Sequence, residues 1–298
     1  MSFRASSVAV LTALVFALAA CGGNDNDNGG SSSTAPAAKK NAKIAAEVPS
    51  AIRSKGTLKV AADATYPPNE FIRPGSKAVV GMDADLAKEL GRAMGLKLQV
   101  VNATFDAIIP GLAAGKYDIG MSSFTDTKER EKTVDFVTYL IAGTEFYVKA
   151  DGGPTVNTLA DLCGQKVGVE KGTTQQDDVT AQSKKCKSAG KPAVKLQVYP
   201  DQNGVNTALS SGRVEVGMAD SPVADYIVKQ SSGQFKVVGK TYGTAPYGVA
   251  LPKGNGMARP VRDAMKLLVD DGTYAAVLAK WGIKHFAIKN PKINDAVS

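Results

Sequence analysis

The stretch that decides the fold prediction is DIGMSSFTDTKER, residues 118–130. It begins as a short apolar strand and continues into a cluster of small hydroxyl side chains, followed by a charged segment that contains Arg130. The hydroxyl residues are Ser122, Ser123 and Thr125. Hydroxyls and free backbone N–H groups donate hydrogen bonds to an anion, and a guanidinium binds both oxygens of a carboxylate. The stretch is therefore suited to holding a carboxylate, and its structural alternative is an ordinary turn or helix cap.

A second copy of this pattern occurs later in the chain. LAAGKYDIGMSS, beginning at Leu112, aligns with LSSGRVEVGMAD, beginning at Leu209. Each copy is typical of a helix that ends at a glycine and is followed by a strand. Where the first copy has Ser123, the second has Asp220. One strand end thus offers donors for an anion and the other a carboxylate for a cation, so a ligand with both charges, such as an amino acid, could bridge them.

Length, composition and net charge limit the number of domains and the classes of binding partner. The chain has 298 residues, 44% of them apolar, which is enough for two domains. The net charge is +8, but the basic residues form no long run, so nucleic-acid binding is not predicted. A solvated basic surface, close to anionic lipid or wall polymer, is the preferred interpretation.

The N-terminus reads as a targeting segment, residues 1–21. Arg4 precedes an apolar run, and residues 18–22, LAACG, resemble a bacterial lipoprotein cleavage site at which Cys21 becomes lipidated. The alternative is a cleaved secretory signal with an incidental cysteine. Residues 22–48, rich in Gly, Asn, Ser and Ala, are predicted to be a flexible tether. This predicts a lipid-anchored protein on the extracytoplasmic face of the cell membrane, in the periplasm if an outer membrane is present.

The other two cysteines are Cys163 and Cys186. In an oxidising compartment a disulfide between them is expected, and it would add about 3 kcal/mol of stability. No metal site or cofactor is predicted, since the single histidine, His285, lies far from both cysteines in the sequence.

Strand and helix patterns alternate along the remaining chain. Residues 58–62 and 96–101 read as strands, and residues 85–94 and 105–114 as helices. The alternation continues after Tyr147, which predicts an α/β fold with largely parallel sheets, and the repeat predicts two such lobes. Because ligands of open α/β sheets bind at the carboxyl ends of strands, the site should lie between the lobes.

The region from about residue 50 to 290 resembles the polar amino acid family of extracytoplasmic solute-binding proteins (family 3), which serve ABC importers. The matching segments, which occur in order along nearly the whole fold, are residues 63–71, 81–86, 105–112, 122–130 and 168–174, the segment around Asp220, and residues 271–274. Asn69 departs from the family pattern, in which an aromatic residue is usual.

The resemblance implies a two-lobed periplasmic-binding-protein-like fold (type II), with a ligand cleft between lobes joined by two crossover strands. The crossovers are expected near residues 141–147 and 242–247. Lobe 1 is expected to comprise residues 49–144 and 245–290, lobe 2 residues 145–244, and a C-terminal tail residues 291–298.

The resemblance also implies residue roles. Arg130 would pair with the ligand α-carboxylate and Asp220 would accept the α-ammonium. The groups that would help with the carboxylate are Ser122, Ser123, Thr125, Thr173 and Thr174. Tyr66 and Phe105 would sandwich the ligand side chain. Asp63 and Glu70 stand where family members read its distal end.

Each role has a structural alternative. Arg130 could be a surface charge, and Asp220 could be the N-cap of the helix that contains Pro222. Tyr66 and Phe105 could be core residues, and Asp63 could hold the turn at Tyr66.

The predicted function is high-affinity binding of a polar, basic L-amino acid by a monomer that closes about a hinge and delivers the ligand to an ABC importer. No enzymatic activity is predicted. Three alternatives stay open: a glutamine- or glutamate-type ligand, a ligand sensor, and an enzyme similar to cyclohexadienyl dehydratases, for which Glu170 is a candidate acid.

Overall fold

The computed structural model describes residues 37–297. The predicted targeting segment, the lipidation site Cys21 and the first part of the tether lie outside these residues. Residues 37–297 belong to one compact unit. Within the described residues no helix combines the length and the apolar character needed to cross a bilayer.

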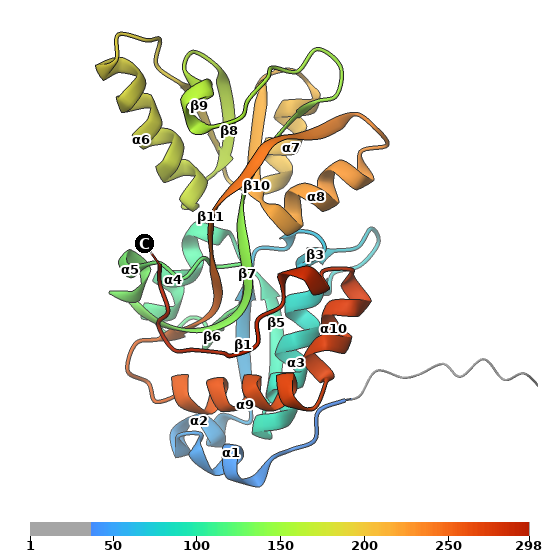
Figure 1. Cartoon of the computed structure of the whole chain (residues 1–298). Coiled ribbons are helices and arrows are strands. Elements are labelled where there is room, and N and C mark those ends of the chain that lie inside the picture. The colour runs from blue at the N-terminus through green and yellow to red at the C-terminus, as the bar shows by residue number, and fades with distance from the viewer. Residues whose placement is uncertain (1–36, 298) are drawn as a thin grey trace, which may run out of the picture. The chain divides into compact units, whose positions relative to one another are not determined.

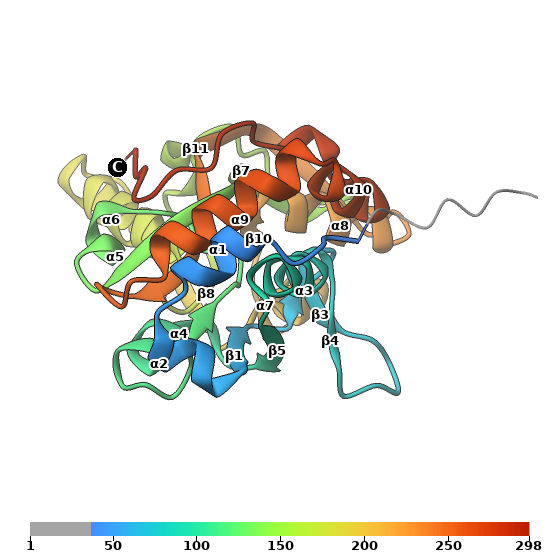
Figure 2. The same cartoon turned by 90° about the horizontal axis from the view of Figure 1, so that it is seen from below.

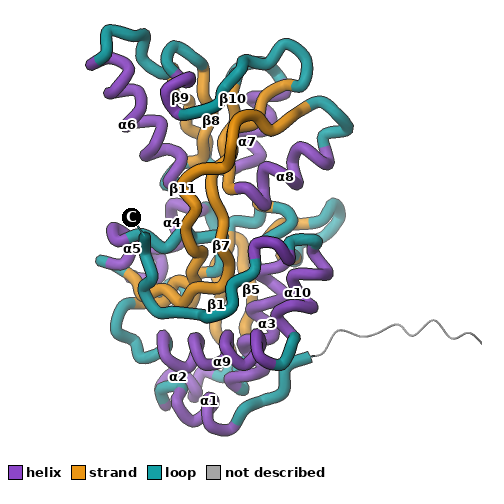
Figure 3. The backbone as a smooth tube through the Cα atoms, in the orientation of Figure 1, coloured by secondary structure: helices purple, strands orange, loops and turns teal. Residues whose placement is uncertain are grey.

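Two groups of elements are joined by two long strands (Figures 1 and 3). Within residues 37–297 eight strands form one continuous sheet. Their order is β5 (Lys97–Asn102), β1 (Thr57–Ala62), β6 (Ile119–Gly120), β11 (Phe235–Pro252), β7 (Val134–Lys149), β10 (Val216–Asp220), β8 (Lys166–Glu170) and β9 (Lys195–Tyr199). A small separate sheet contains β2 (Thr65–Tyr66), β3 (Glu70–Ile72) and β4 (Val79–Val80).

The predicted two-lobed α/β fold with two crossover strands is confirmed. In lobe 1 the strand β1 pairs in parallel with β5 and β6, and in lobe 2 the strand β8 pairs in parallel with β9 and β10. The crossovers are parts of β7 and β11, which pair antiparallel with each other over most of their length. The sheet is therefore mixed, because the crossovers continue as full members of both lobes instead of being short links.

Helices cover the sheet in each lobe (Figure 1). Those of lobe 1 are α2 (Ser50–Lys55), α3 (Met82–Met94), α4 (Phe105–Ala113), α5 (Lys128–Glu131), α9 (Ala258–Asp270) and α10 (Thr273–Trp281), with a 3-10 turn η2 (Lys284–Phe286). Those of lobe 2 are α6 (Thr174–Ser188), α7 (Gln202–Ser210) and α8 (Ser221–Gln230), with η1 (Leu159–Leu162). Leu86, Leu90 and Met94 recur at helical spacing on α3 and are buried, as their periodicity predicts.

The C-terminal part of the chain completes lobe 1. Helices α9 and α10 pack against α3. Beyond them, Ile293 forms a β-bridge with Val137, and the Asn294 N–H donates to the Phe136 carbonyl over 3.1 Å. The segment expected to be a tail is bonded to lobe 1 as far as Ala296, whose N–H donates to Glu131 Oε1 over 3.3 Å.

The tether prediction is wrong for its last part. Helix α1 (Ala42–Glu47) lies beside α9 and α3 (Figure 2), capped by the Asn41 side chain. Ile44 and Val48 are buried in the lobe 1 core, and the Ala38 N–H donates to Glu89 Oε2 over 2.8 Å. The composition is poor in large apolar residues, but these two are spaced so that both reach the core.

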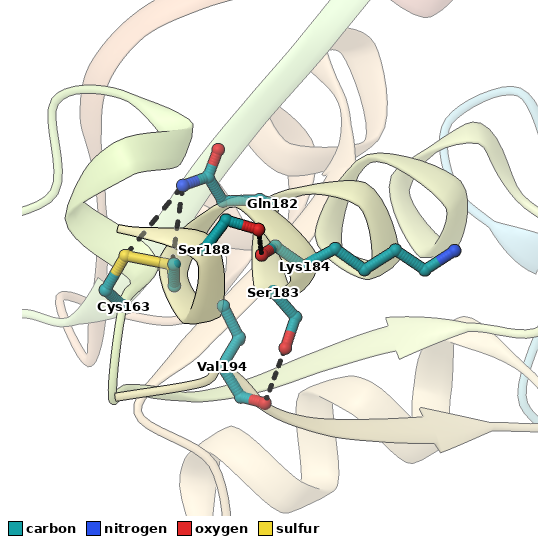
Figure 4. Close-up of a disulfide and its surroundings, with 7 residues drawn as sticks. Cys163, Gln182, Ser183, Lys184, Ser188 and Val194 are labelled. Carbon is teal, nitrogen blue, oxygen red and sulfur yellow. Dashed lines mark hydrogen bonds between the residues drawn. A yellow bond between two sulfur atoms is a disulfide. The ribbon is translucent and has the colours of Figure 1, made fainter. Parts of the chain in front are cut away.

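The predicted disulfide between Cys163 and Cys186 is present in lobe 2 (Figure 4). It joins the end of η1 to α6, and the Gln182 side-chain amide donates to both sulfurs over 3.8 and 3.4 Å. Among the described residues no group of histidine, cysteine or acidic side chains is arranged to hold a metal ion.

Candidate ligand-binding site

A cavity lies between the two lobes, at the carboxyl ends of β6 and β10. Its walls contain Tyr66, Phe105, Ser123, Thr125 and Arg130 from lobe 1, and Thr173, Thr174, Gln175, Gln202, Ala219, Asp220 and Val223 from lobe 2. The two copies of the sequence repeat thus meet here, as the repeat predicts. Of the residues predicted for the site, Asp63, Glu70 and Ser122 are not in the walls.

Arg130 is held with its guanidinium in the cavity wall. Thr127 is the N-cap of α5, and its hydroxyl accepts from the Arg130 N–H over 3.2 Å. Nη1 donates to the Thr125 carbonyl over 2.9 Å, and Nη2 donates across the cleft to the Gly172 carbonyl over 3.0 Å. The guanidinium also lies 5.2 Å from the centre of the Phe105 ring, within cation–π range. Arg130 is therefore not a free surface charge, because both lobes fix its planar group.

Asp220 is the corresponding anion of lobe 2. It stands at the N-cap position of α8, yet its side chain makes no capping hydrogen bond. Its oxygens accept from the Tyr247 hydroxyl over 2.7 Å and from Gln175 Nε2 over 2.6 Å. Burial raises the pKa of Asp220 to about 6, while these two donors act in the opposite direction. At neutral pH the site therefore presents an oriented carboxylate.

The aromatic residues Tyr66 and Phe105 lie on the lobe 1 side of the cavity. Both are buried, with ring centres 6.0 Å apart and planes at 63°. Phe105 stacks on Phe124 at 4.5 Å. The two rings belong to the apolar core and also line the cavity, so the two interpretations made from the sequence are compatible.

Ser123 is turned toward the interior of lobe 1. Its backbone has φ 51°, in the left-handed region. Its hydroxyl accepts from Asn69 Nδ2 over 3.0 Å and donates to Glu70 over 3.1 Å, while its N–H donates to Asp83 over 3.2 Å. Asn69, the residue that departs from the family pattern, therefore helps to fix Ser123.

Glu70 lies behind Ser123 and is fully buried. Burial, together with the charge of the neighbouring Asp83, raises the pKa of Glu70 well above its usual value. The expected contact of Glu70 with the distal end of a ligand is not supported by this position. The sequence does not reveal the buried position of Glu70, because the path of the turn between Tyr66 and Glu70 cannot be predicted from its residues.

Asp63 and Ser122 also point into lobe 1. The Asp63 N–H donates to the Ser122 hydroxyl oxygen over 2.8 Å. The Asp63 carboxylate accepts from the Thr65 hydroxyl over 2.7 Å and from the Phe105 N–H over 3.0 Å. Asp63 thus holds the turn before Tyr66, the alternative weighed from the sequence, and burial raises its pKa to about 6.

The loop before α6 contributes backbone donors. Thr173 is the N-cap of α6, and its hydroxyl accepts from the Gln176 N–H over 3.3 Å and donates to the Glu170 carbonyl over 2.7 Å. The first N–H groups of a helix have no intrahelical acceptor and favour an anion. The backbone at Thr173 and Thr174, more than their hydroxyls, is therefore suited to a carboxylate.

Gln175 and Gln202 line the cavity but were not predicted. Gln175 directly follows Thr173 and Thr174, so its proximity to them in sequence was a usable signal. Gln202 donates to the Tyr147 hydroxyl over 2.7 Å from the start of α7, and no sequence feature marked it.

The rim of the cleft carries a contact between lobes. Lys171 Nζ of lobe 2 lies 2.8 Å from Asp106 Oδ2 of lobe 1. Between them Gly172 has φ +78° and approaches Asp106 so closely that an added Cβ would lie 3.0 Å from the Asp106 Cβ. The glycine is therefore required for this closed arrangement.

Comparison with known proteins gives a consistent result. The arginine-binding protein ArgT of Corynebacterium glutamicum is 31% identical over 286 residues, which cover 96% of this chain and 93% of ArgT. An ancestral arginine-binding protein solved with arginine has a TM-score of 0.70 and 38% identity, and covers 76% of this chain and 98% of its own. The ancestral amino acid-binding protein AncCDT-1, a precursor of cyclohexadienyl dehydratase, has a TM-score of 0.69 and 34% identity, with 78% and 97% covered. Residues 58–284 match the model of one family, and the chain therefore belongs to the bacterial extracellular solute-binding proteins, family 3.

Proposed function

We propose that this protein binds a basic L-amino acid and delivers it to an ABC importer. The observation that carries the proposal is the placement of Arg130 and Asp220 on opposite lobes of one cavity. An α-amino acid has a carboxylate and an ammonium on the same carbon, so it matches this pair of charges. Arg130, Thr125 and the α6 N–H groups hold the carboxylate, and Asp220 accepts from the ammonium.

Two observations support a basic ligand: the ligands named for two similar proteins, and the negative charge next to the cavity wall. ArgT and the ancestral protein are arginine-binding proteins by name. In this chain Asp63 neighbours Tyr66 of the cavity wall and supplies negative charge there without lining the cavity. Glu70 and Ser122 do not line the cavity either. Glu70 accepts from the Ser123 hydroxyl, and the Ser122 hydroxyl accepts from the Asp63 N–H, so each fixes a residue of the site.

Closure of the two lobes accompanies binding in this proposal. Ligand docks on Arg130 and the aromatic rings of lobe 1, and lobe 2 then brings Asp220 to the ammonium. The cleft excludes water, which strengthens charge-assisted hydrogen bonds and makes the loss of either partner costly.

We propose binding without turnover. A dehydratase is the second candidate, since AncCDT-1 is a precursor of such an enzyme and a dehydratase needs an acid inside the cleft. Glu170 supplies the observation in its favour, because its carboxyl is buried and neighbours Tyr66 of the cavity wall. Incubation with prephenate or arogenate separates the two: product formation supports the enzyme, and unchanged substrate supports binding alone.

The membrane anchor belongs to the same proposal. A lipid on Cys21 keeps a monomeric binding protein close to its permease on the extracytoplasmic face. Fractionation of cells tests this, with Cys21→Ser expected to move the protein from the membrane to the soluble fraction. Retention of that variant in the membrane would contradict the anchor.

The ligand is tested by thermal unfolding of the purified protein with each of the twenty amino acids, ornithine and citrulline. A ligand at 100 times its dissociation constant adds about 2.7 kcal/mol of stability. A shift with arginine, lysine or ornithine supports the basic class. A shift with glutamine or glutamate keeps amino acid binding and rejects the basic class, and no shift rejects both.

A further inference from the structure

One buried carboxyl, which neighbours the cavity wall, has no role in amino acid binding as proposed above. Glu170 ends β8 and is 1% exposed. Within the described residues neither of its carboxylate oxygens has a hydrogen-bond partner. A buried carboxyl without a partner is costly to maintain, so its place next to a cavity points to a ligand group that completes it.

The groups that face Glu170 are acidic or phenolic. Asp63 approaches from lobe 1 and Asp201 from the residue before α7, and both act on the pKa of Glu170 through their charges. Tyr66 and Tyr147 are the hydroxyl-bearing neighbours: burial, and to a smaller extent the charge of Glu170, raises the pKa of each. The nearest cation in sequence, Lys171, is paired 2.8 Å from Asp106 on the rim.

This acidic group connects to the cavity wall. Tyr66 lines the cavity and also neighbours Glu170. Gln202 lines it too, and the Gln202 N–H donates over 3.3 Å to the Thr65 hydroxyl, which in turn donates to Asp63 over 2.7 Å. The acids are therefore neighbours of two wall residues and do not line the cavity themselves.

We propose that Glu170 is a specificity residue, which pairs with the cationic end of a basic amino acid and releases its own proton to solvent when that ligand binds. The inference rests on the proposed function and concerns a residue to which the family resemblance gives no ligand role. The balance is simple: the neutral carboxylic acid becomes a carboxylate, the ligand cation keeps its charge, and one proton leaves.

The protonation state before binding supports this step. Burial and the charge of Asp63 raise the pKa of Glu170 to about 9, so the group is largely neutral at pH 8. At that pH Asp63 and Asp220, each with a pKa of about 6, are already ionised. A guanidinium or ammonium placed against Glu170 would reverse the shift, because an opposite charge favours the ionised form.

The test is calorimetric titration with L-arginine at pH 8 in two buffers of different ionisation enthalpy. The wild-type protein should release about one proton per arginine bound, and none with citrulline, whose side chain is similar in shape but neutral. Glu170→Gln should release none with arginine, bind it roughly 10- to 100-fold more weakly and bind citrulline as before. Asp151→Asn, which removes an exposed charge from the same lobe, should match the wild type.

The outcomes separate the inference from the proposed function. Arginine binding with the same affinity and proton release in Glu170→Gln would overturn the role of Glu170 and leave the function standing. Binding of neutral amino acids alone would overturn the role too. Failure of every amino acid to bind would overturn both. Thermal unfolding of Glu170→Gln checks its fold, which the replacement of a neutral acid by its amide should preserve.

Discussion

The Tyr247 hydroxyl donates to Asp220 Oδ2 over 2.7 Å, which ties the crossover strand β11 to the end of β10. The other oxygen of Asp220 accepts from Gln175 over 2.6 Å. The carboxylate that we assign to the ligand ammonium is thus oriented by one residue of the hinge and one of the second lobe. Closure of the lobes and alignment of this acceptor are therefore linked structurally.

This arrangement predicts an acid limit for binding. The pKa of Asp220 is about 6 in the ligand-free protein, and only its ionised form accepts from an ammonium. The affinity for citrulline, which does not engage Glu170 in this proposal, should accordingly be constant between pH 7 and 8 and fall by up to about tenfold per pH unit below pH 6. Calorimetry with citrulline measures this without a charged side chain.

The control for the acid limit is Asp220→Asn. It should bind citrulline weakly at all pH values between 5 and 8 and show a much flatter profile. An unchanged profile in this variant would assign the titration to another group.

Arg130 should contribute most to holding the carboxylate. Its Nη1 is bonded to the Thr125 carbonyl of the same lobe, which orients the guanidinium before ligand arrives. The bond from Nη2 to the Gly172 carbonyl of lobe 2 belongs to the closed arrangement. Arg130→Ala should cost about 2–5 kcal/mol of binding free energy. Arg130→Lys should recover little of it, because an ammonium lacks the planar fork.

Lys128→Ala is the matched control, since Lys128 is an exposed cation on the same short helix. It should leave the dissociation constant within about twofold of the wild type. Equal losses in the Lys128 and Arg130 variants would indicate a general effect of charge and not a contact.

Parts of this site could be predicted from the sequence because they depend on local pattern. The repeat places Ser123 and Asp220 after equivalent strands, and parallel strands bring their carboxyl ends together. Arg130 follows the first strand within one short helix, so its position is set by the same segment. Fold class and disulfide follow from alternation and from the number of cysteines.

Other parts depend on packing that no local pattern encodes. The inward bonding of Ser123 requires Asn69, Glu70 and Asp83, which come from different segments. A polar residue on a loop gives no signal of which way it faces, so the sequence predicts a ligand contact for Glu70 although the side chain lies behind Ser123. The buried position of Ile44 likewise depends on α9, more than 200 residues later in the chain.

Removal of the disulfide should lower stability and leave binding intact. Cys163 and Cys186 are separated by 23 residues, and closing such a loop stabilises the fold by about 3 kcal/mol. Neither cysteine lines the cavity. The double variant Cys163→Ala/Cys186→Ala should unfold at lower urea concentration, with the dissociation constant within about twofold.

A reductant provides the control for the disulfide. It should shift the wild-type unfolding midpoint toward that of the double variant and have no effect on the double variant itself. Equal midpoints for the reduced and oxidised wild type would argue against a stabilising role.

Helix α1 should contribute to the stability of lobe 1. Ile44 is buried in its core, and the Asn41 N–H donates to the Ala93 carbonyl over 3.0 Å. Ile44→Ala should cost about 2 kcal/mol in the free energy of unfolding, measured with urea. The exposed neighbour Lys43 offers a control, because Lys43→Ala should change it by less than about 0.5 kcal/mol.

The pair formed by Lys171 and Asp106 should act on the rate of ligand release. Its atoms lie 2.8 Å apart across the rim, and the lysine side chain is 62% exposed. An exposed ion pair contributes at most about 1 kcal/mol, so Lys171→Ala should weaken binding no more than about fivefold. Because the contact joins the two lobes, most of this loss should appear as faster dissociation in stopped-flow measurements.

Salt distinguishes this contact from a structural effect of the substitution. At about 1 M salt, charges at this distance on the surface are strongly screened, so wild type and Lys171→Ala should release ligand at similar rates. Lys184→Ala, which removes an exposed lysine from α6, should match the wild type at every salt concentration. A rate difference between wild type and Lys171→Ala that persists at high salt would instead attribute the effect to the shape of the loop that carries Gly172.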